Sequence, residues 1–174
     1  MRASAIAGVE RRTLEPHTDE RGTLREVWRG SRQPFEVRQV LTTTSNAGAL
    51  RGMHYHLRQA DLCYVPVGRV FMALVDLRSE PYAKEELRLS GGESVLIPPG
   101  VAHGYVAEVD AMVCYLLSAE VDGSDEFGFR FDDPAVGIGW PVAKPILSAR
   151  DRDAGTFAAA IEDVRARKAA GVRP

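Results

Sequence analysis

Residues 52–56 read Gly52-Met53-His54-Tyr55-His56, and residues 92–103 read Gly92-Glu93-Ser94-Val95-Leu96-Ile97-Pro98-Pro99-Gly100-Val101-Ala102-His103. Side chains two residues apart in a strand point to the same face, so the first stretch predicts that both imidazoles enter one cavity. The second stretch predicts a strand, a Pro-Gly turn and a new strand that carries a third histidine. We therefore expect His103 to meet the first pair across a barrel.

Further strand signals extend this pattern along the chain. Runs rich in Val, Leu, Tyr or Phe, each bounded by turn residues, fall at residues 37–44, 62–67, 69–76, 86–89, 94–97, 104–109 and 111–117. Such closely spaced strands predict an all-β protein, an antiparallel barrel or jelly roll. Near the end, Phe157, Ile161 and Val164 recur at helical spacing, which predicts a single C-terminal helix ended by Gly171 and Pro174.

Length and composition favour one domain over residues 1–174. A chain of 174 residues with 45% hydrophobic content is large enough to bury a core and short for two domains. The formal net charge of -2 offers no basic field to a phosphate backbone, so nucleic acid is not expected as a partner. No apolar run reaches the roughly 18 residues of a membrane span, and Cys63 and Cys114 suit buried thiols in a reducing compartment. We therefore expect a cytoplasmic protein without membrane contact.

The spacing of the two histidine motifs resembles that of the cupin superfamily. His54-x-His56 is followed by four residues, Asp61, six further residues and Gly68, and the second motif ends in His103. One chemical departure is that Asp61 stands where cupins usually carry glutamate. The resemblance implies a cupin-type antiparallel jelly-roll barrel, here with a short C-terminal helix.

More specific stretches resemble the dTDP-4-dehydrorhamnose 3,5-epimerase family. In chain order they are Asp19-Glu20-Arg21-Gly22, Leu50-Arg51-Gly52-Met53-His54, Ile97-Pro98-Pro99-Gly100-Val101-Ala102-His103-Gly104, Phe131-Asp132-Asp133-Pro134, Gly137-Ile138-Gly139-Trp140-Pro141 and Leu147-Ser148-Ala149-Arg150-Asp151. The likeness covers roughly three-quarters of the chain in matching order. It implies an isomerase that needs no metal and acts, usually as a homodimer, on a nucleotide-linked 4-keto-6-deoxy sugar.

Epimerisation beside a ketone requires a base, donors that hold the enolate, and an acid on the opposite face. By resemblance, His54 is the base, Asp151 the carboxylate that orients it, Tyr115 the acid, and His103 a second active-site histidine. The alternatives are a helix-capping role for Asp151 and a core position for Tyr115. The family's substrate-binding positions fall on Arg21, Glu26, Gln39, Arg51, Glu126 and Arg150, and arginines suit a diphosphate because their planar fork gives bidentate contacts.

Two positions depart from the family at the centre of its active site. Counting back from Gly68, the family's lysine falls on Asp61, and the glutamine two residues after the base falls on His56. These changes complete the ligand set of metal-binding cupins, with His54, His56, Asp61 and His103 around Zn, Fe, Ni or Mn. Under that alternative, a metal-bound His54 has no lone pair left to act as base.

Three functions therefore follow from the sequence. The leading prediction is a 3,5- or 3-epimerase of a dTDP-4-keto-6-deoxy-hexose-like substrate that works without a cofactor. The first alternative is a metal-dependent cupin isomerase or oxygenase built on the four-residue ligand set. The second alternative is a sugar-binding cupin that has kept the pocket and lost catalysis.

Overall fold

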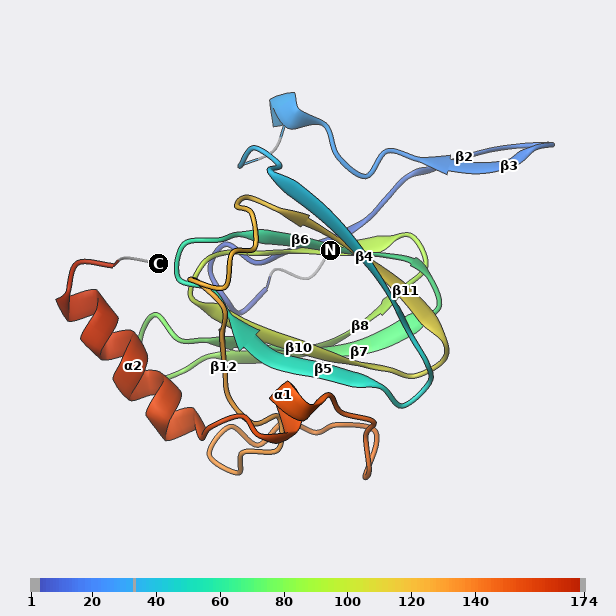
Figure 1. The fold of residues 1–174 in the computed structure, drawn as a ribbon. Coiled ribbons are helices and arrows are strands. Elements are labelled where there is room, and N and C mark those ends of the chain that lie inside the picture. Colours follow the sequence, from blue (N-terminus) through green and yellow to red (C-terminus); the bar gives the residue numbers. More distant parts are fainter. Residues whose placement is uncertain (1–3, 33, 173–174) are drawn as a thin grey trace.

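The computed structural model describes residues 4–32 and 34–172, in which two five-stranded antiparallel sheets face each other as a flattened barrel (Figure 1). The first sheet has the order β1-β9-β6-β11-β4, formed by Glu10–Thr13, Glu93–Ile97, Asp61–Val67, Ala111–Leu117 and Gln39–Ser45. The second has the order β12-β5-β10-β7-β8, formed by Phe127–Gly128, Leu50–Tyr55, Val101–Ala107, Arg69–Asp76 and Lys84–Ser90. The prediction of a cupin-type jelly roll is confirmed.

The central strand β7 shows how the sequence fills both faces of a sheet. Its residues Val70, Met72 and Leu74 point between the sheets, where they join the main hydrophobic cluster. The alternate residues, Ala73 and Val75 among them, point outward and pack with the segments that cover the barrel. Because both faces are covered, this strand is apolar along nearly its whole length and was easily predicted from the sequence.

Strands β5 and β10 approach each other closely at two glycines. Gly52 has a φ of 129°, and a Cβ atom there would lie only 2.5 Å from the Cα of Gly104. Next to this contact, His54 of β5 lies opposite His103 of β10 in the antiparallel register. The two histidines are thus neighbours within one sheet, which corrects the prediction that His103 meets the pair from across the barrel.

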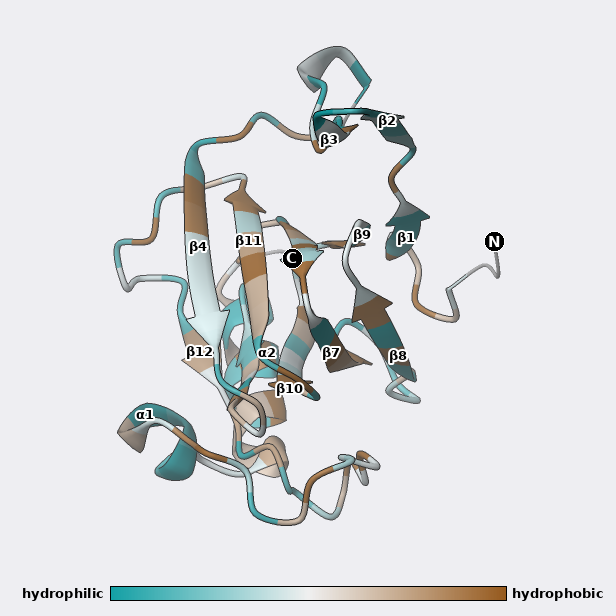
Figure 2. Cartoon of the chain, turned by 90° about the vertical axis from the view of Figure 1, so that its right-hand side faces the viewer, coloured by the Kyte–Doolittle hydropathy of each residue, from teal (hydrophilic) through white to brown (hydrophobic). Residues whose placement is uncertain are grey.

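A polar hairpin near the N-terminus was not predicted from the sequence. Within the described part of the chain, strands β2 (Pro16–Asp19) and β3 (Gly22–Arg25) pair with each other alone. They project from the barrel (Figure 1), and β2 is largely hydrophilic (Figure 2). The short 3-10 helix η1 (Gly30–Arg32) follows before the chain enters β4. These strands escape sequence analysis because they bury no apolar face and therefore show no alternation of hydrophobic residues.

Two helices, and not the single one expected, lie near the C-terminal end of the described residues. Helix α1 (Ala149–Arg152) is one turn long, and α2 (Phe157–Ala169) begins after the cap Thr156, whose side chain accepts a hydrogen bond from the Ala159 N–H. The buried face of α2 packs with Met53 and Tyr55 on the outer side of β5. Gly171 follows α2 with a φ of 90°, whereas Pro174 lies outside the described residues. Neither helix, nor any other in residues 4–32 and 34–172, has the length and apolarity to cross a membrane.

Candidate active site

A cavity of about 570 Å³ opens at one end of the barrel, between β5 and β10 of one sheet and β4 and β11 of the other. Most of the predicted site residues line it together. They are Arg51, His54, His56, Asp61, His103, Tyr115, Glu126, Arg150 and Asp151. The fold therefore gathers residues that are up to 100 positions apart in the sequence into one solvent-connected space.

The first constellation in the cavity is a histidine-carboxylate pair. The Nε2 atom of His54 lies 2.6 Å from an Oδ1 of Asp151, and the carboxylate is almost fully buried. Asp151 sits in the first turn of α1, where the N-cap Ser148 accepts its backbone N–H at 3.1 Å. Burial opposes ionisation of Asp151. The hydrogen bond that its carboxylate accepts from His54, together with nearby positive charge, nevertheless keeps the pKa of Asp151 below its usual value.

An ionised Asp151 fixes the tautomer of the ring beside it. A carboxylate can only accept, so the Nε2–H of His54 donates to Asp151 and the lone pair stays on Nδ1. Asp151 also stabilises the imidazolium that forms when Nδ1 takes a proton. The capping alternative considered from the sequence is wrong, because Ser148 caps α1 and Thr156 caps α2, while Asp151 is an acid in the first turn of α1 that contacts His54.

Tyr115 reaches the same cavity from the opposite sheet. It lies on β11, opposite Leu41 of β4 and Cys63 of β6. Burial, with the charges near it, raises the pKa of Tyr115 well above 10.0, so the phenol stays protonated at neutral pH. A protonated phenol that faces a cavity can donate its proton to a substrate oxygen or carbon. Tyr115 therefore lines the cavity as well as packing against the core.

The second constellation is a buried cluster of two histidines and one carboxylate. An Oδ2 of Asp61 lies 3.6 Å from Nε2 of His56 and 3.4 Å from Nε2 of His103. Burial, together with His56 and His54 nearby, lowers the pKa of His103 to about 3. Burial likewise raises the pKa of Asp61. Of the four ligands considered from the sequence, the structure groups these three, while His54 turns to Asp151.

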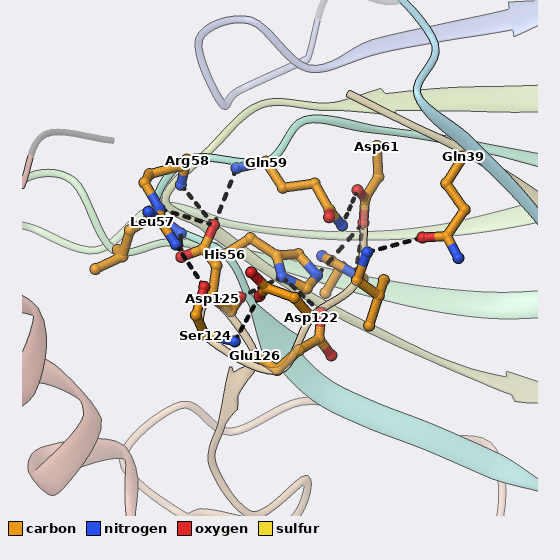
Figure 3. Close-up of polar contacts among 12 residues, drawn as sticks. Gln39, His56, Leu57, Arg58, Gln59, Asp61, Asp122, Ser124, Asp125 and Glu126 are labelled. Atoms are coloured by element: carbon orange, nitrogen blue, oxygen red, sulfur yellow. Dashed lines mark hydrogen bonds and ion pairs between the residues drawn. The ribbon is translucent and has the colours of Figure 1, made fainter. Parts of the chain in front are cut away.

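One loop residue that sequence analysis missed positions this cluster. The side-chain carboxylate of Asp125 accepts hydrogen bonds from the backbone N–H groups of Leu57, Arg58 and Gln59 at 2.9, 2.9 and 3.1 Å (Figure 3). The backbone carbonyl of Asp125 accepts a hydrogen bond from Nδ1–H of His56 at 2.6 Å. His56 lies just after β5 ends at Tyr55, so these bonds, not the strand, set its ring. A lone aspartate in a polar loop carries no periodic signal that could have identified it.

The predicted substrate-binding residues divide into two groups. Arg51, Glu126 and Arg150 line the cavity, and Arg150 lies 3.4 Å from Glu126. Gln39 stands beside it, where its Oε1 accepts the backbone N–H of Val121, another lining residue, at 2.8 Å.

Arg21 and Glu26 are not brought to the cavity by their own chain. Arg21 lies at the tip of the projecting hairpin, where it pairs with Asp19, and Glu26 pairs with Arg29. Both pairs lie on the exposed surface, away from the residues that line the cavity of His54. The structure therefore does not place these two side chains among the residues that line this cavity.

A jelly-roll barrel with a histidine-carboxylate pair and a tyrosine in one cavity defines a cupin-fold enzyme site, and comparison with known proteins identifies its family. Residues 3–159 match the family model described as dTDP-4-dehydrorhamnose 3,5-epimerase, and the chain belongs to this family.

Its relatives agree in sequence and in fold. The chain is 33% identical over 145 residues to the spore coat polysaccharide biosynthesis protein SpsL of Bacillus subtilis, covering 78% of this chain and 96% of that one. It superposes on the rmlC epimerase of Mycobacterium tuberculosis with a TM-score of 0.85 at 32% identity, covering 99% and 92% of the two chains. The 3'-monoepimerase ChmJ of Streptomyces bikiniensis, solved in complex with dTDP-quinovose, gives a TM-score of 0.86 at 31% identity, covering 95% and 91%.

Proposed function

We propose that the protein is an epimerase of a dTDP-linked 4-keto-6-deoxy hexose and inverts carbon 3, or carbons 3 and 5, beside the ketone. The observation that carries this proposal is the pair of His54 and Asp151 in one cavity with Tyr115. The family and the epimerases among the chain's relatives support it over a sugar-binding protein without catalysis.

The reaction begins with a proton transfer to His54. Hydrogens on carbons 3 and 5 are acidic because the anion formed by their loss is an enolate of the C4 ketone. Nδ1 of His54 takes the proton, and the imidazolium is stabilised by Asp151. The ion pair formed is well matched, since the low pKa of Asp151 keeps the carboxylate charged.

The reaction ends when a proton returns to the opposite face of the same carbon. Tyr115 is suited to this step because it comes from the opposite sheet and keeps its proton at neutral pH. The phenolate left behind takes a proton from solvent and the His54 imidazolium releases its proton to solvent, which completes the cycle. Arg51 and Arg150 are the cations of the cavity wall and would bind the diphosphate.

We also propose that the active form is a cytoplasmic homodimer. Val40 of the edge strand β4 is 55% exposed and Val67 of β6 is 61% exposed, which leaves an apolar surface for a second copy. The projecting hairpin could then carry Arg21 to the partner's cavity. The free thiols Cys63 and Cys114 suit a reducing compartment.

The experiment is to incubate the protein with dTDP-4-keto-6-deoxyglucose and follow the sugar by proton NMR. We expect new resonances of a product inverted at carbon 3 alone or at carbons 3 and 5. A sugar that binds tightly and keeps its configuration after many hours would contradict the proposal and favour the sugar-binding alternative.

A further inference from the structure

We propose that His56, Asp61 and His103 bind one divalent transition-metal ion, whose open coordination positions face the cavity that also holds His54. One donor atom from each of the three residues lies within 4.8 Å of the other two. All three side chains are buried and belong to the wall of that cavity. Binding of the ion stands independently of the proposed epimerase activity.

The spacing of the donor atoms suits an ion between them. The contacts of Asp61 Oδ2 with the two Nε2 atoms, 3.6 and 3.4 Å, are too long for good hydrogen bonds. In a tetrahedral site with metal-ligand bonds of about 2.0 to 2.2 Å, neighbouring ligand atoms lie about 3.4 Å apart. The two distances from Oδ2 of Asp61 therefore already match those around a bound ion, and the two imidazole donors lie within 4.8 Å of each other.

The hydrogen bonds on the far side of each ring direct the lone pairs inward. Nδ1 of His56 donates to the carbonyl of Asp125 at 2.6 Å, and Nδ1 of His103 donates to the carbonyl of Val101 at 3.3 Å. A neutral ring that donates from Nδ1 keeps its lone pair on Nε2, and the Nε2 atoms of both rings are the ones that face Oδ2 of Asp61. Two lone pairs and a carboxylate oxygen repel one another unless a cation or a proton lies between them.

The outer contacts of the cluster are those expected around metal ligands. Oε1 of Glu126 lies 3.3 Å from Nδ1 of His56, which adds a carboxylate behind that imidazole. The Nε2 amide of Gln59 donates to Oδ1 of Asp61 at 2.8 Å and leaves Oδ2 for the ion. Such partners orient ligating groups and raise their basicity.

This assignment differs from the four-ligand set considered from the sequence, because His54 is left out. His54 keeps its bond to Asp151 and its free Nδ1, so a metal and a catalytic base can coexist in one cavity. Two imidazoles and one carboxylate suit Zn²⁺, Fe²⁺, Ni²⁺ or Mn²⁺. Asp61 stands where the family has a lysine, so the ion could replace that lysine and polarise the sugar ketone. This role of the ion rests on the proposed function.

The test begins with elemental analysis of untagged protein purified without chelator. Metal-stripped protein is then titrated calorimetrically with Zn²⁺, Ni²⁺ and Mn²⁺. We expect one ion per chain, and a loss of affinity of more than about 100-fold in Asp61→Asn, which keeps the shape of the side chain. Gln59→Ala, outside the ligand set, should lose roughly 10- to 100-fold. If Asp61→Asn fails to fold, Gln59→Ala still tests the site.

Two control variants separate this site from other histidine sites. His17→Gln removes the exposed histidine of β2, and His54→Gln removes the proposed base; both should bind the ion within a few-fold of the wild type. Absence of stoichiometric binding, or equal binding by Asp61→Asn, overturns the proposal. An equal loss of metal affinity in His54→Gln and Asp61→Asn overturns the three-ligand assignment. Epimerisation measured on the same samples tests the proposed function separately, since metal-free protein that still epimerises refutes only a role of the ion in the reaction and leaves ion binding to the titration.

Discussion

At the scale of single residues, the proposed function makes Tyr115 the group that returns a proton to the opposite face of the sugar. His54 and Tyr115 lie on strands of different sheets and line one cavity, so a sugar between them would meet a base and an acid on different sides. The pKa of Tyr115 is raised well above 10.0 chiefly by burial, so the protonated acid form is the one present below that pH. Acid catalysis by this group is therefore available at neutral and mildly alkaline pH.

Tyr115→Phe keeps the ring and removes the proton donor. We expect the rate of inverted product to fall by about 10²- to 10⁴-fold, the usual contribution of a positioned acid. In the wild type, we expect no loss from Tyr115 ionisation between about pH 8 and about pH 10, the ordinary pKa of tyrosine. Initial rates by NMR across this range check both points. A decline centred near pH 9 that disappears in the variant would contradict the raised pKa.

The sequence predicted which side chains enter the site better than it predicted how they are paired. His54, His56 and His103 could be assigned because their motifs fix strand positions. The bond from His54 to Asp151 spans 97 positions, so only the family resemblance, and no local spacing, predicted this pair. For the same reason, spacing alone grouped His54 with the ligand set, whereas the structure separates them.

At the scale of elements, the contact of β5 with β10 sets the position of His54, which pairs with Asp151, relative to His103 of the buried histidine-carboxylate cluster. Gly52 combines a positive φ with a Cβ position blocked by the backbone of Gly104, and it lies two residues before His54. A side chain at this position must push the strands apart or change the backbone conformation. Either change would displace His54 relative to His103, its partner in the register.

Gly52→Ala should therefore lower the free energy of unfolding by roughly 1 to 3 kcal/mol, the cost of a strained backbone position. The matched control is Gly155→Ala, because Gly155 has an ordinary φ and open space at its Cβ position. That variant should stay within about 0.5 kcal/mol of the wild type. Urea denaturation of the three proteins makes the comparison. Equal stability of Gly52→Ala and Gly155→Ala would show that the strands tolerate a side chain there.

Two apolar strands were predicted to the residue, β10 (Val101–Ala107) was predicted as 104–109, and the polar elements were not predicted. Strands β7 and β11 match the predicted ranges 69–76 and 111–117, because buried strands carry continuous apolar runs. The hairpin of β2 and β3 was missed since its side chains are almost all exposed. Helix α1 was missed because a single turn, held by the Ser148 cap, is too short to show helical periodicity.

At the scale of the whole molecule, the projecting hairpin suggests a site shared between two copies. Arg21 occupies a substrate-binding position by family resemblance, yet it lies on a hairpin that pairs with no other strand among the described residues. Leu24 of the same hairpin is 66% exposed, an apolar side chain that a partner would cover. In a two-fold dimer, each hairpin can serve the other copy's cavity.

Mixed dimers test this arrangement. Arg21→Ala and His54→Gln should each be nearly inactive as homodimers. If Arg21 acts on the partner's site, coexpression of the two variants restores about a quarter of the wild-type activity, because half of the dimers are mixed and each has one complete site. Light scattering first establishes the dimer. Activity that stays at the level of the single variants would place Arg21 outside the partner's site.

Solvent deuterium uptake by the sugar, followed by mass spectrometry and NMR in D₂O, tests the central claim most directly. The wild type should introduce deuterium at carbon 3, or at carbons 3 and 5, of dTDP-4-keto-6-deoxyglucose, since a base must remove the proton before inversion. His54→Gln should lose this exchange by at least about 10²-fold while its thermal unfolding and sugar binding remain close to those of the wild type. Exchange by His54→Gln at the wild-type rate would contradict the account, because proton removal would then belong to another group.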